Sequence, residues 1–201
     1  MNLEETRRTY DRIAARYAAR DVYPMTRELA AFVLHLPPGS TVVDIGCGTG
    51  EYAQMIAACG YRVQALDLSA GMLAQASKKG LRLLARADMR RLPLPSECAQ
   101  GCFLSASLLH IPRAEAPLAL SEIHRVLRDA GVAFMSLKAG DGCASRPEPE
   151  GGARYFVYYQ PAALDQLLLQ AGFSVVDGWI SPPSEGQRQP WIARVVRKVP
   201  R

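Results

Sequence analysis

Three closely spaced glycines are the residues of this chain best suited to hold a ligand. They are Gly46, Gly48 and Gly50 in the run VVDIGCGTG, which covers residues 42–50 and begins with apolar residues. Glycine lets the backbone approach a ligand closely, and the helix expected to follow points the positive end of its dipole at the same place. The pattern therefore predicts that a carboxylate or phosphate of a cofactor lies over residues 46–50.

Asp67 is the second candidate contact to this cofactor. It ends the next apolar run, VQALD, where the tip of an adjacent strand would bring its carboxylate to ribose hydroxyls. The same carboxylate could instead cap a helix that starts after Ser69. A dinucleotide fingerprint GxGxxG beginning at Gly46 needs a small residue at position 51, where Glu51 stands. We therefore expect a nucleoside-bearing cofactor, with a nicotinamide or flavin dinucleotide as the alternative.

His110 is the candidate general base. It follows an apolar run, at a position where α/β proteins place active-site loops, and the ordinary pKa of histidine suits proton transfer near neutral pH. Packing beside Leu109 and Ile111 would give it a structural role instead. Asp44 lies inside the glycine motif, and we expect it either to contact the cofactor or to brace the loop.

Aromatic residues mark two further segments. Tyr10 and Tyr17 lie in the polar N-terminal run YDRIAARYAAR, and Tyr155 and Tyr158 follow a stretch rich in glycine and proline. Tyr10, Tyr155 and Tyr158 are candidate substrate contacts. Alternating aromatic residues also suit a strand packed on the core, so both interpretations stay open for the second segment.

Five strand-like runs alternate with three helical patterns around these residues. The strands are expected at 41–45, 62–66, 81–87, 101–105 and 132–137. The helical patterns lie at 51–59, 70–79 and 114–128. This alternation is typical of βαβ units and predicts an α/β fold with a doubly wound, mostly parallel sheet. In the third helix the residues with core spacing are Leu118, Ile123, Val126 and Leu127.

The chain is expected to form a single domain, 1–201, in four parts. Its segments are N-terminal cap helices (1–36), a cofactor-binding core (41–138), a polar lid or substrate loop (139–160), and a C-terminal helix and hairpin (161–201). The hairpin strands are expected at 173–180 and 191–198, joined by a polar loop.

The composition indicates an ordinary globular protein. Apolar residues make up 49% and charged residues 21% of the chain, and the net charge of +5 is spread out, so it does not by itself predict nucleic-acid binding. The apolar runs are strand-sized and no apolar signal region follows the N-terminus, so neither a membrane span nor secretion is expected. The five cysteines are scattered without a CxxC pair, which predicts no zinc site and favours the reducing cytoplasm.

The run VVDIGCGTG, followed by Asp67 after a second strand, resembles the cofactor-binding core of the class I S-adenosylmethionine-dependent methyltransferases of the small-molecule type. The resemblance implies a Rossmann-like seven-stranded sheet in the order 3-2-1-4-5-7-6, with helices on both faces and an antiparallel last strand. It also implies S-adenosyl-L-methionine as cofactor and S-adenosyl-L-homocysteine as product. The implied cofactor contacts are Tyr17, Asp44, Gly46, Cys47, Gly48, Gly50, Asp67, Leu68, Met72, Asp88, Met89, Ser105 and Ala106.

The same resemblance distributes these contacts over the cofactor. The glycine motif and residues 105–106 would meet the methionine part, with Tyr17 near its carboxylate. Asp67 would bind the ribose, and residues 68–72 and 88–89 would surround the adenine.

The resemblance implies an enzyme that transfers a methyl group to O, N or S of a small-molecule acceptor by in-line displacement. Such a reaction depends mostly on positioning and water exclusion, and a base is needed only when the acceptor arrives protonated. An RNA methyltransferase and a non-catalytic S-adenosylmethionine-binding protein are the alternatives. We expect a cytoplasmic monomer or homodimer without nucleic-acid or membrane partners, and the residues do not identify the acceptor.

Overall fold

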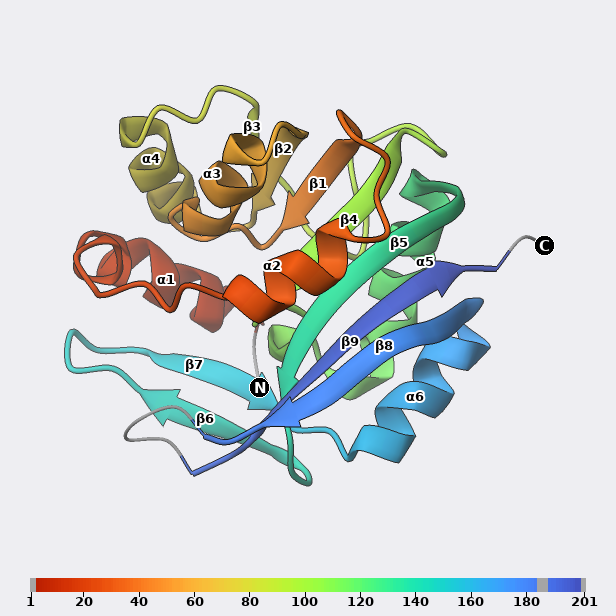
Figure 1. Ribbon diagram of the computed structural model, residues 1–201. Coiled ribbons are helices and arrows are strands. Elements are labelled where there is room, and N and C mark those ends of the chain that lie inside the picture. Colours follow the sequence, from red (N-terminus) through yellow and green to blue (C-terminus); the bar gives the residue numbers. More distant parts are fainter. Residues whose placement is uncertain (1–2, 184–187, 200–201) are drawn as a thin grey trace.

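A computed structural model describes residues 3–183 and 188–199 and shows one large sheet covered by helices (Figure 1). Within the described residues, seven strands form this sheet in the order β3-β2-β1-β4-β5-β9-β8. Their bounds are β1 Thr41–Ile45, β2 Arg62–Asp67, β3 Leu84–Arg86, β4 Ala99–Ser105, β5 Leu127–Lys138, β8 Phe173–Ser181 and β9 Trp191–Lys198. When only these strands are numbered, the order is 3-2-1-4-5-7-6, which confirms the predicted topology.

Strand pairing brings the carboxyl ends of the central strands together. β1 pairs in parallel with β2 and with β4, so that Ile45 lies opposite Leu66 and Asp44 lies opposite Phe103. β9 runs antiparallel to both β5 and β8. The chain order reverses between β1 and β4, which is the point where open α/β sheets bind ligands.

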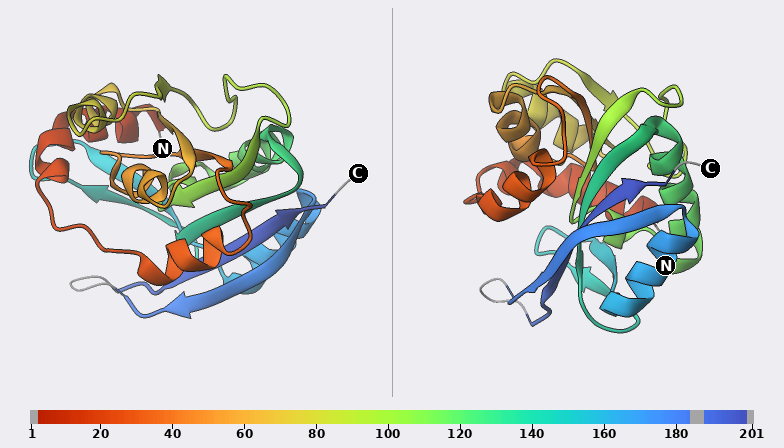
Figure 2. Two further views of the ribbon diagram at one scale, coloured as in Figure 1. Left: turned by 45° about the horizontal axis from the view of Figure 1, so that its top comes forward. Right: turned by 45° about the vertical axis from the view of Figure 1, so that its right-hand side comes forward.

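Helices cover the sheet in two groups (Figure 2). One face carries α2 Thr26–Val33, α3 Glu51–Ala58 and α4 Ala70–Lys78, and the other carries α5 Ala116–Val126 and α6 Pro161–Gln170. On the first face, Phe32 packs on Phe103, whose ring stacks 4.8 Å from that of Phe134. On the second, Ile123 and Leu168 are fully buried. Apolar burial on both faces therefore fixes where the strand tips lie.

The third predicted helix is shorter than expected. α5 ends at Val126, and from Leu127 the chain continues as the strand β5. At this boundary the N–H of Cys98 donates a hydrogen bond to the Val126 carbonyl. Leu118 is 56% exposed, so its predicted place in the core is wrong; Leu120 fills the inner face of the helix instead. The strand predicted at 81–87 is also reduced to β3, which has a neighbour on one side only.

Residues 139–160 contain a second, two-stranded sheet, so the prediction of a loop is wrong for residues 143–147 and 153–157. β6 Cys143–Pro147 pairs antiparallel with β7 Ala153–Val157, and the glycine-rich stretch between them makes the turn. Aromatic side chains pack this hairpin against the core: Tyr155, Phe156, Tyr158 and Tyr159. The alternation of these aromatics therefore reflects a packed strand.

The first helix, α1 Leu3–Ala18, lies between α4 and β7, across the carboxyl ends of the strands (Figure 1). Asp11 accepts hydrogen bonds from the Ser69 hydroxyl at 2.6 Å and the Gly71 N–H at 2.9 Å. On the hairpin side, the N–H of Tyr155 donates to the Thr6 hydroxyl at 2.9 Å. α1 is thus tied to both neighbours. In the polar loop predicted between β8 and β9, residues 184–187 lie outside the described residues.

Candidate functional site

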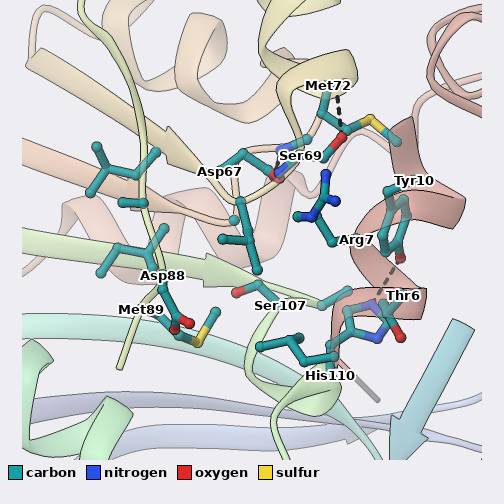
Figure 3. A pocket seen from close by; sticks show the side chains of 18 of the residues that line it. Thr6, Arg7, Tyr10, Asp67, Ser69, Met72, Asp88, Met89, Ser107 and His110 are labelled. Carbon is teal, nitrogen blue, oxygen red and sulfur yellow. Dashed lines mark hydrogen bonds between the residues drawn. The ribbon is translucent and has the colours of Figure 1, made fainter. Parts of the chain in front are cut away.

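A cavity lies where the glycine motif, the end of β2 and α1 meet (Figure 3). It encloses about 800 Å³ of space, part of it open to solvent. The predicted site residues that line it are Tyr10, Tyr17, Gly46, Gly48, Asp67, Leu68, Met72, Asp88, Met89, Ser105, Ala106 and His110. The fold therefore brings most of the predicted residues to one place.

Five predicted site residues do not line the cavity. Asp44 and Cys47 are buried, and Gly50 is the N-cap that precedes α3. Tyr155 and Tyr158 belong to the hairpin segment, and Tyr155 contributes to the site through its main chain, whose carbonyl accepts from His110 and whose N–H donates to Thr6. The position of the two tyrosine side chains does not support a substrate role for them.

The glycine turn uses its N–H groups within the protein. Those of Gly46 and Cys47 donate to the Leu66 carbonyl at 2.7 and 2.9 Å. That of Gly48 donates to the Asp67 carboxylate at 2.8 Å. The expectation that these three N–H groups bind an anionic group of the ligand is therefore wrong, because they already donate to Leu66 and Asp67 at the end of β2. The turn instead offers the ligand space and a fixed backbone shape.

Two of the three glycines leave no room for a side chain. Gly46 and Gly50 have φ values of 77° and 86°, in the left-handed region. A Cβ on Gly46 would lie 2.4 Å from Cβ of Ser107, and one on Gly50 would lie 2.4 Å from Cδ1 of Leu81. Gly48 has a similar φ of 56° but nothing within 4 Å. Gly46 thus shapes the cavity, while Gly50 allows α3 to pack.

The Asp67 carboxylate fastens the loops around the cavity and also faces it. Its Oδ2 accepts from the N–H of Gly48 and its Oδ1 from the N–H of Ser69, each at 2.8 Å. Burial raises the pKa of Asp67, and the two main-chain hydrogen bonds oppose that effect. Each carboxylate oxygen can accept a second hydrogen bond. The helix cap considered for Asp67 is Ser69 instead, whose hydroxyl accepts from the Met72 N–H, and Asp67 keeps acceptor sites for ribose hydroxyls.

Two further acids lie close to Asp67. Asp44 is 1% exposed, and its Oδ2 has no hydrogen-bond partner among the described residues. Burial, together with the charges of Asp67 and Glu51, raises the pKa of Asp44 to about 8. Glu51 is bound by the Thr49 hydroxyl and by Lys79. Asp44 is therefore mostly protonated near neutral pH and Glu51 is neutralised by Lys79, so the Asp67 carboxylate is the group here that favours a cationic ligand and disfavours a pyrophosphate.

Part of the cavity wall is apolar. Leu68, Met72 and Met89 belong to this part. Asp88 is held in an ion pair, because Arg90 donates through Nε at 3.0 Å and through its main-chain N–H at 2.9 Å. Although burial alone would raise it, these bonds lower the pKa of Asp88. Asp88 thus lies at the predicted position as a fixed carboxylate at the rim.

His110 lies at the other end of the cavity, under α1. Its Nδ1 is 2.5 Å from the Tyr155 carbonyl, so Nδ1 carries the proton, and Nε2 accepts from the Tyr10 hydroxyl at 2.8 Å. Burial, assisted by the charges of Arg154 and Lys138 and opposed by the bond to Tyr155, lowers the pKa of His110 to about 4. The ring is thus a weak base with both nitrogens engaged. This corrects the expectation of a general base with a pKa near neutrality.

We expect His110 to contribute to the pH dependence of stability. Its pKa in the folded state lies below the ordinary value of 6.5, so the unfolded chain binds more protons between pH 6.5 and 4. The stability that the neutral ring contributes is therefore lost as the pH falls through this range. In urea denaturation at a series of pH values, the difference in unfolding free energy between the wild type and His110→Gln should shrink from pH 7 to pH 4.5. A difference that stays constant would contradict the lowered pKa, since other titrating groups cancel in the comparison.

Several residues of the lining were missed from the sequence. Thr6 and Arg7 lie one turn before Tyr10 on the same face of α1, so helical spacing from that tyrosine would have found them. Ser69 and Ser107 carry no motif of their own, because the polar role of each depends on tertiary contacts. The other missed residues of the lining are apolar: Leu3, Ile45, Leu66, Ala87 and Ile111.

The described residues also limit other kinds of site. Between residues 3 and 183 and between 188 and 199, no helix is long and apolar enough to cross a membrane. In the same residues, no group of three or more His, Cys, Asp or Glu side chains could hold a metal ion. The five cysteines are free thiols, with Cys47 and Cys102 buried.

Comparisons with known sequences give one consistent result. A family profile described as a methyltransferase domain matches residues 43–135. The uncharacterized methyltransferase YodH of Bacillus subtilis is 36% identical over 161 residues, which cover 76% of this chain and 68% of that protein. A malonyl-[acyl-carrier protein] O-methyltransferase of Serratia marcescens is 39% identical over 105 residues, which are 51% of this chain. The match spans 40% of the length of that relative.

A comparison with solved structures addresses the fold. The 1,6-didemethyltoxoflavin-N1-methyltransferase of Burkholderia thailandensis, solved with 1,6-didemethyltoxoflavin and S-adenosylhomocysteine, aligns with a TM-score of 0.78. The alignment covers 98% of this chain and 88% of that protein at 21% sequence identity. At this identity, the likeness shows a shared fold.

Proposed function

Because this chain belongs to the class I S-adenosylmethionine-dependent methyltransferases, we propose that it transfers the methyl group of S-adenosylmethionine to O, N or S of a small-molecule acceptor. The single observation that carries the proposal is the position of Asp67, whose carboxylate faces the cavity beside the glycine turn. The Asp67 carboxylate also disfavours the pyrophosphate of a dinucleotide beside the glycine turn.

Each part of the cavity has a role in this proposal. Asp67 would accept hydrogen bonds from the ribose, and the apolar wall that contains Leu68 and Met72 would hold the adenine. Asp44 is buried and does not line the cavity, and we assign it to bracing the glycine loop. Tyr17 lines the cavity from α1, where a contact to the methionine carboxylate is proposed.

When bound, the cofactor supplies a methyl group on a sulfonium, whose positive charge disappears during transfer. The protein's contribution is then to align the acceptor with the methyl group and to exclude water. α1 would exclude water from the cavity, because its hydrogen bonds to Ser69 and to the hairpin hold it across the strand ends. The wall near Ser107 and His110 would position the acceptor, since it lies beyond the glycine turn.

A small acceptor is favoured by the way the cavity is enclosed. α1 and the hairpin both lie over the strand ends, which leaves a pocket that fits a small molecule. The bonds of Arg90 and Arg125 to carboxylates also engage basic side chains that could otherwise contact RNA. We therefore favour a small molecule over RNA as the methyl acceptor.

Binding and transfer assays with the purified chain test this function. We expect S-adenosylhomocysteine, and not NAD, to raise the melting temperature, and tritium from S-adenosyl[methyl-³H]methionine to appear on a small acceptor. Tight binding without transfer to any class of acceptor would instead indicate a non-catalytic binding protein. Transfer to RNA with strong salt dependence would indicate the nucleic-acid alternative.

A further inference from the structure

Ser107 is a buried polar residue of the cavity whose hydroxyl has no hydrogen-bond partner among the described residues. Its residue exposure is 6%. It lies between the glycine turn and His110, since a Cβ on Gly46 would meet its Cβ and its carbonyl accepts the His110 N–H at 3.1 Å (Figure 3). A buried hydroxyl without a partner is costly, which indicates that a ligand supplies the missing hydrogen bond.

The other polar groups at this end of the cavity are already engaged. The Tyr10 hydroxyl donates to His110 and accepts from Arg154 at 3.4 Å. Arg7 is bound by Glu4 and by Asp11. The Thr6 hydroxyl accepts from the Tyr155 N–H. Among these groups, the Ser107 hydroxyl has no hydrogen-bond partner within the described residues, and no strong base stands beside it.

Positive charge gathers behind His110. The ring of Phe156 lies 4.9 Å from that of His110 and has three cations around it: Arg146 at 5.2 Å, Arg154 at 5.3 Å and Lys138 at 6.0 Å. The same Arg154 and Lys138 disfavour a proton on His110. By the same electrostatics, these charges favour an anion beside the ring.

The acids nearest to this cluster are held in ion pairs. Glu148 binds Arg154 and also Arg16. Glu4 and Asp11 bind Arg7 on α1. The acceptor end of the cavity thus has the Ser107 hydroxyl in its wall and cations behind His110, whereas the unpaired acid Asp44 does not line the cavity.

Building on the proposed function, we infer that the acceptor is an organic acid whose carboxylate is bound by the Ser107 hydroxyl and methylated on oxygen. A carboxylate is already an anion near neutral pH, so the reaction needs no base. A lone pair of one carboxylate oxygen forms the bond to the methyl carbon as the carbon–sulfur bond breaks, and that electron pair stays on sulfur. The products are a methyl ester and S-adenosylhomocysteine, and no proton moves. Opposite charges cancel in this step, which a buried site favours.

The chemical stability of the product tests this inference. The full chain is incubated with S-adenosyl[methyl-³H]methionine and three matched sets of acceptors: benzoate, phenylacetate and octanoate; the corresponding alcohols; and the corresponding amines. Mild alkali releases volatile methanol from methyl esters but not from ethers or N-methylamines. We expect alkali-labile tritium from the acids, at a rate that is constant between pH 6 and 8.

The possible outcomes separate this inference from the proposed function. Alkali-stable tritium from the alcohols or amines would overturn the carboxylate acceptor while leaving the methyltransferase function in place. No transfer to any set, with S-adenosylhomocysteine still bound in calorimetry, would overturn the function and this inference together.

A substitution tests the role of Ser107 itself. Ser107→Ala removes one hydrogen bond to a charged group, so kcat/KM for the acid should fall about tenfold, mainly through KM, while S-adenosylhomocysteine affinity stays unchanged. Ser145→Ala, which removes an exposed hydroxyl on β6, is the matched control and should have no effect. An unchanged KM in Ser107→Ala would contradict contact between this hydroxyl and the acceptor.

Discussion

Replacing Asp67 with alanine is expected to weaken S-adenosylhomocysteine binding by about 100-fold. The carboxylate lines the cavity and keeps acceptor sites that the two ribose hydroxyls would fill. A hydrogen bond to a charged group contributes about 1.5 kcal/mol or more, so the loss of two costs about 3 kcal/mol, or about 100-fold in affinity. Isothermal titration calorimetry measures this loss directly, and unchanged affinity would refute the ribose assignment.

Two controls separate the ribose contact from the fastening of the loops. Asp67→Asn keeps the size of the side chain and one acceptor oxygen, so its loss should be smaller than that of alanine. Asp21→Asn, at an exposed position outside the cavity, should bind like the wild type. An S-adenosylhomocysteine analogue that lacks the 2′-hydroxyl should bind more weakly to the wild type but lose little further in Asp67→Ala. Equal losses in both proteins would mean that Asp67 acts on the loop alone.

Replacing Gly46 with alanine is expected to lower both stability and cofactor affinity. The left-handed φ of 77° costs about 1 to 2 kcal/mol for a residue with a side chain, and the overlap with Ser107 adds about 1 to 3 kcal/mol. We therefore expect the free energy of unfolding to fall by about 3 kcal/mol, as measured by urea denaturation. The displaced Ser107 would also narrow the cavity, so S-adenosylhomocysteine affinity should fall at least about tenfold.

The chain offers a matched control for the conformational part of this effect. Gly60 has a comparable φ of 87°, but a Cβ there would meet nothing within 4 Å. Gly60→Ala should therefore show the conformational cost without the overlap and should leave cofactor affinity intact. Adding Ser107→Gly to Gly46→Ala should recover part of the lost stability. If Gly46→Ala and Gly60→Ala were equally destabilised, the overlap with Ser107 would have no energetic consequence.

The sequence predicts most of the fold because its signals are local and repeated. Alternating strand and helix patterns were enough to place the central strands, and the resemblance supplied the order that the structure confirms. The boundary errors occur where tertiary contacts override local pattern: backbone pairing ends α5 before Leu127, and packing converts the glycine- and proline-rich segment into a hairpin. Neither contact produces a periodic pattern of apolar residues at the end of α5 or in the hairpin segment.

For the site, too, local sequence signals were sufficient for some residues, and tertiary contacts determined the rest. Gly46 and Asp67 were found because residue type and chain position were sufficient. The use of the Gly46 N–H was predicted wrongly, since the Leu66 carbonyl that accepts it comes from the neighbouring strand. The protonation state of His110 could not be predicted from the sequence, because it depends on burial of the ring and on the Tyr155 carbonyl of the distant hairpin. Ser107 was missed because nothing in its residue type or chain position distinguishes it. It matters because its buried hydroxyl has no hydrogen-bond partner among the described residues, and this can be seen only in the folded chain.

The most direct test of the account is a crystal structure of the chain with S-adenosylhomocysteine. We expect the ribose hydroxyls within hydrogen-bond distance of the Asp67 carboxylate, the adenine against Leu68 and Met72, and the sulfur directed toward the space between Ser107 and His110. Nucleoside density elsewhere on the molecule, or a ribose that does not contact Asp67, would contradict the assignment of this cavity as the cofactor site.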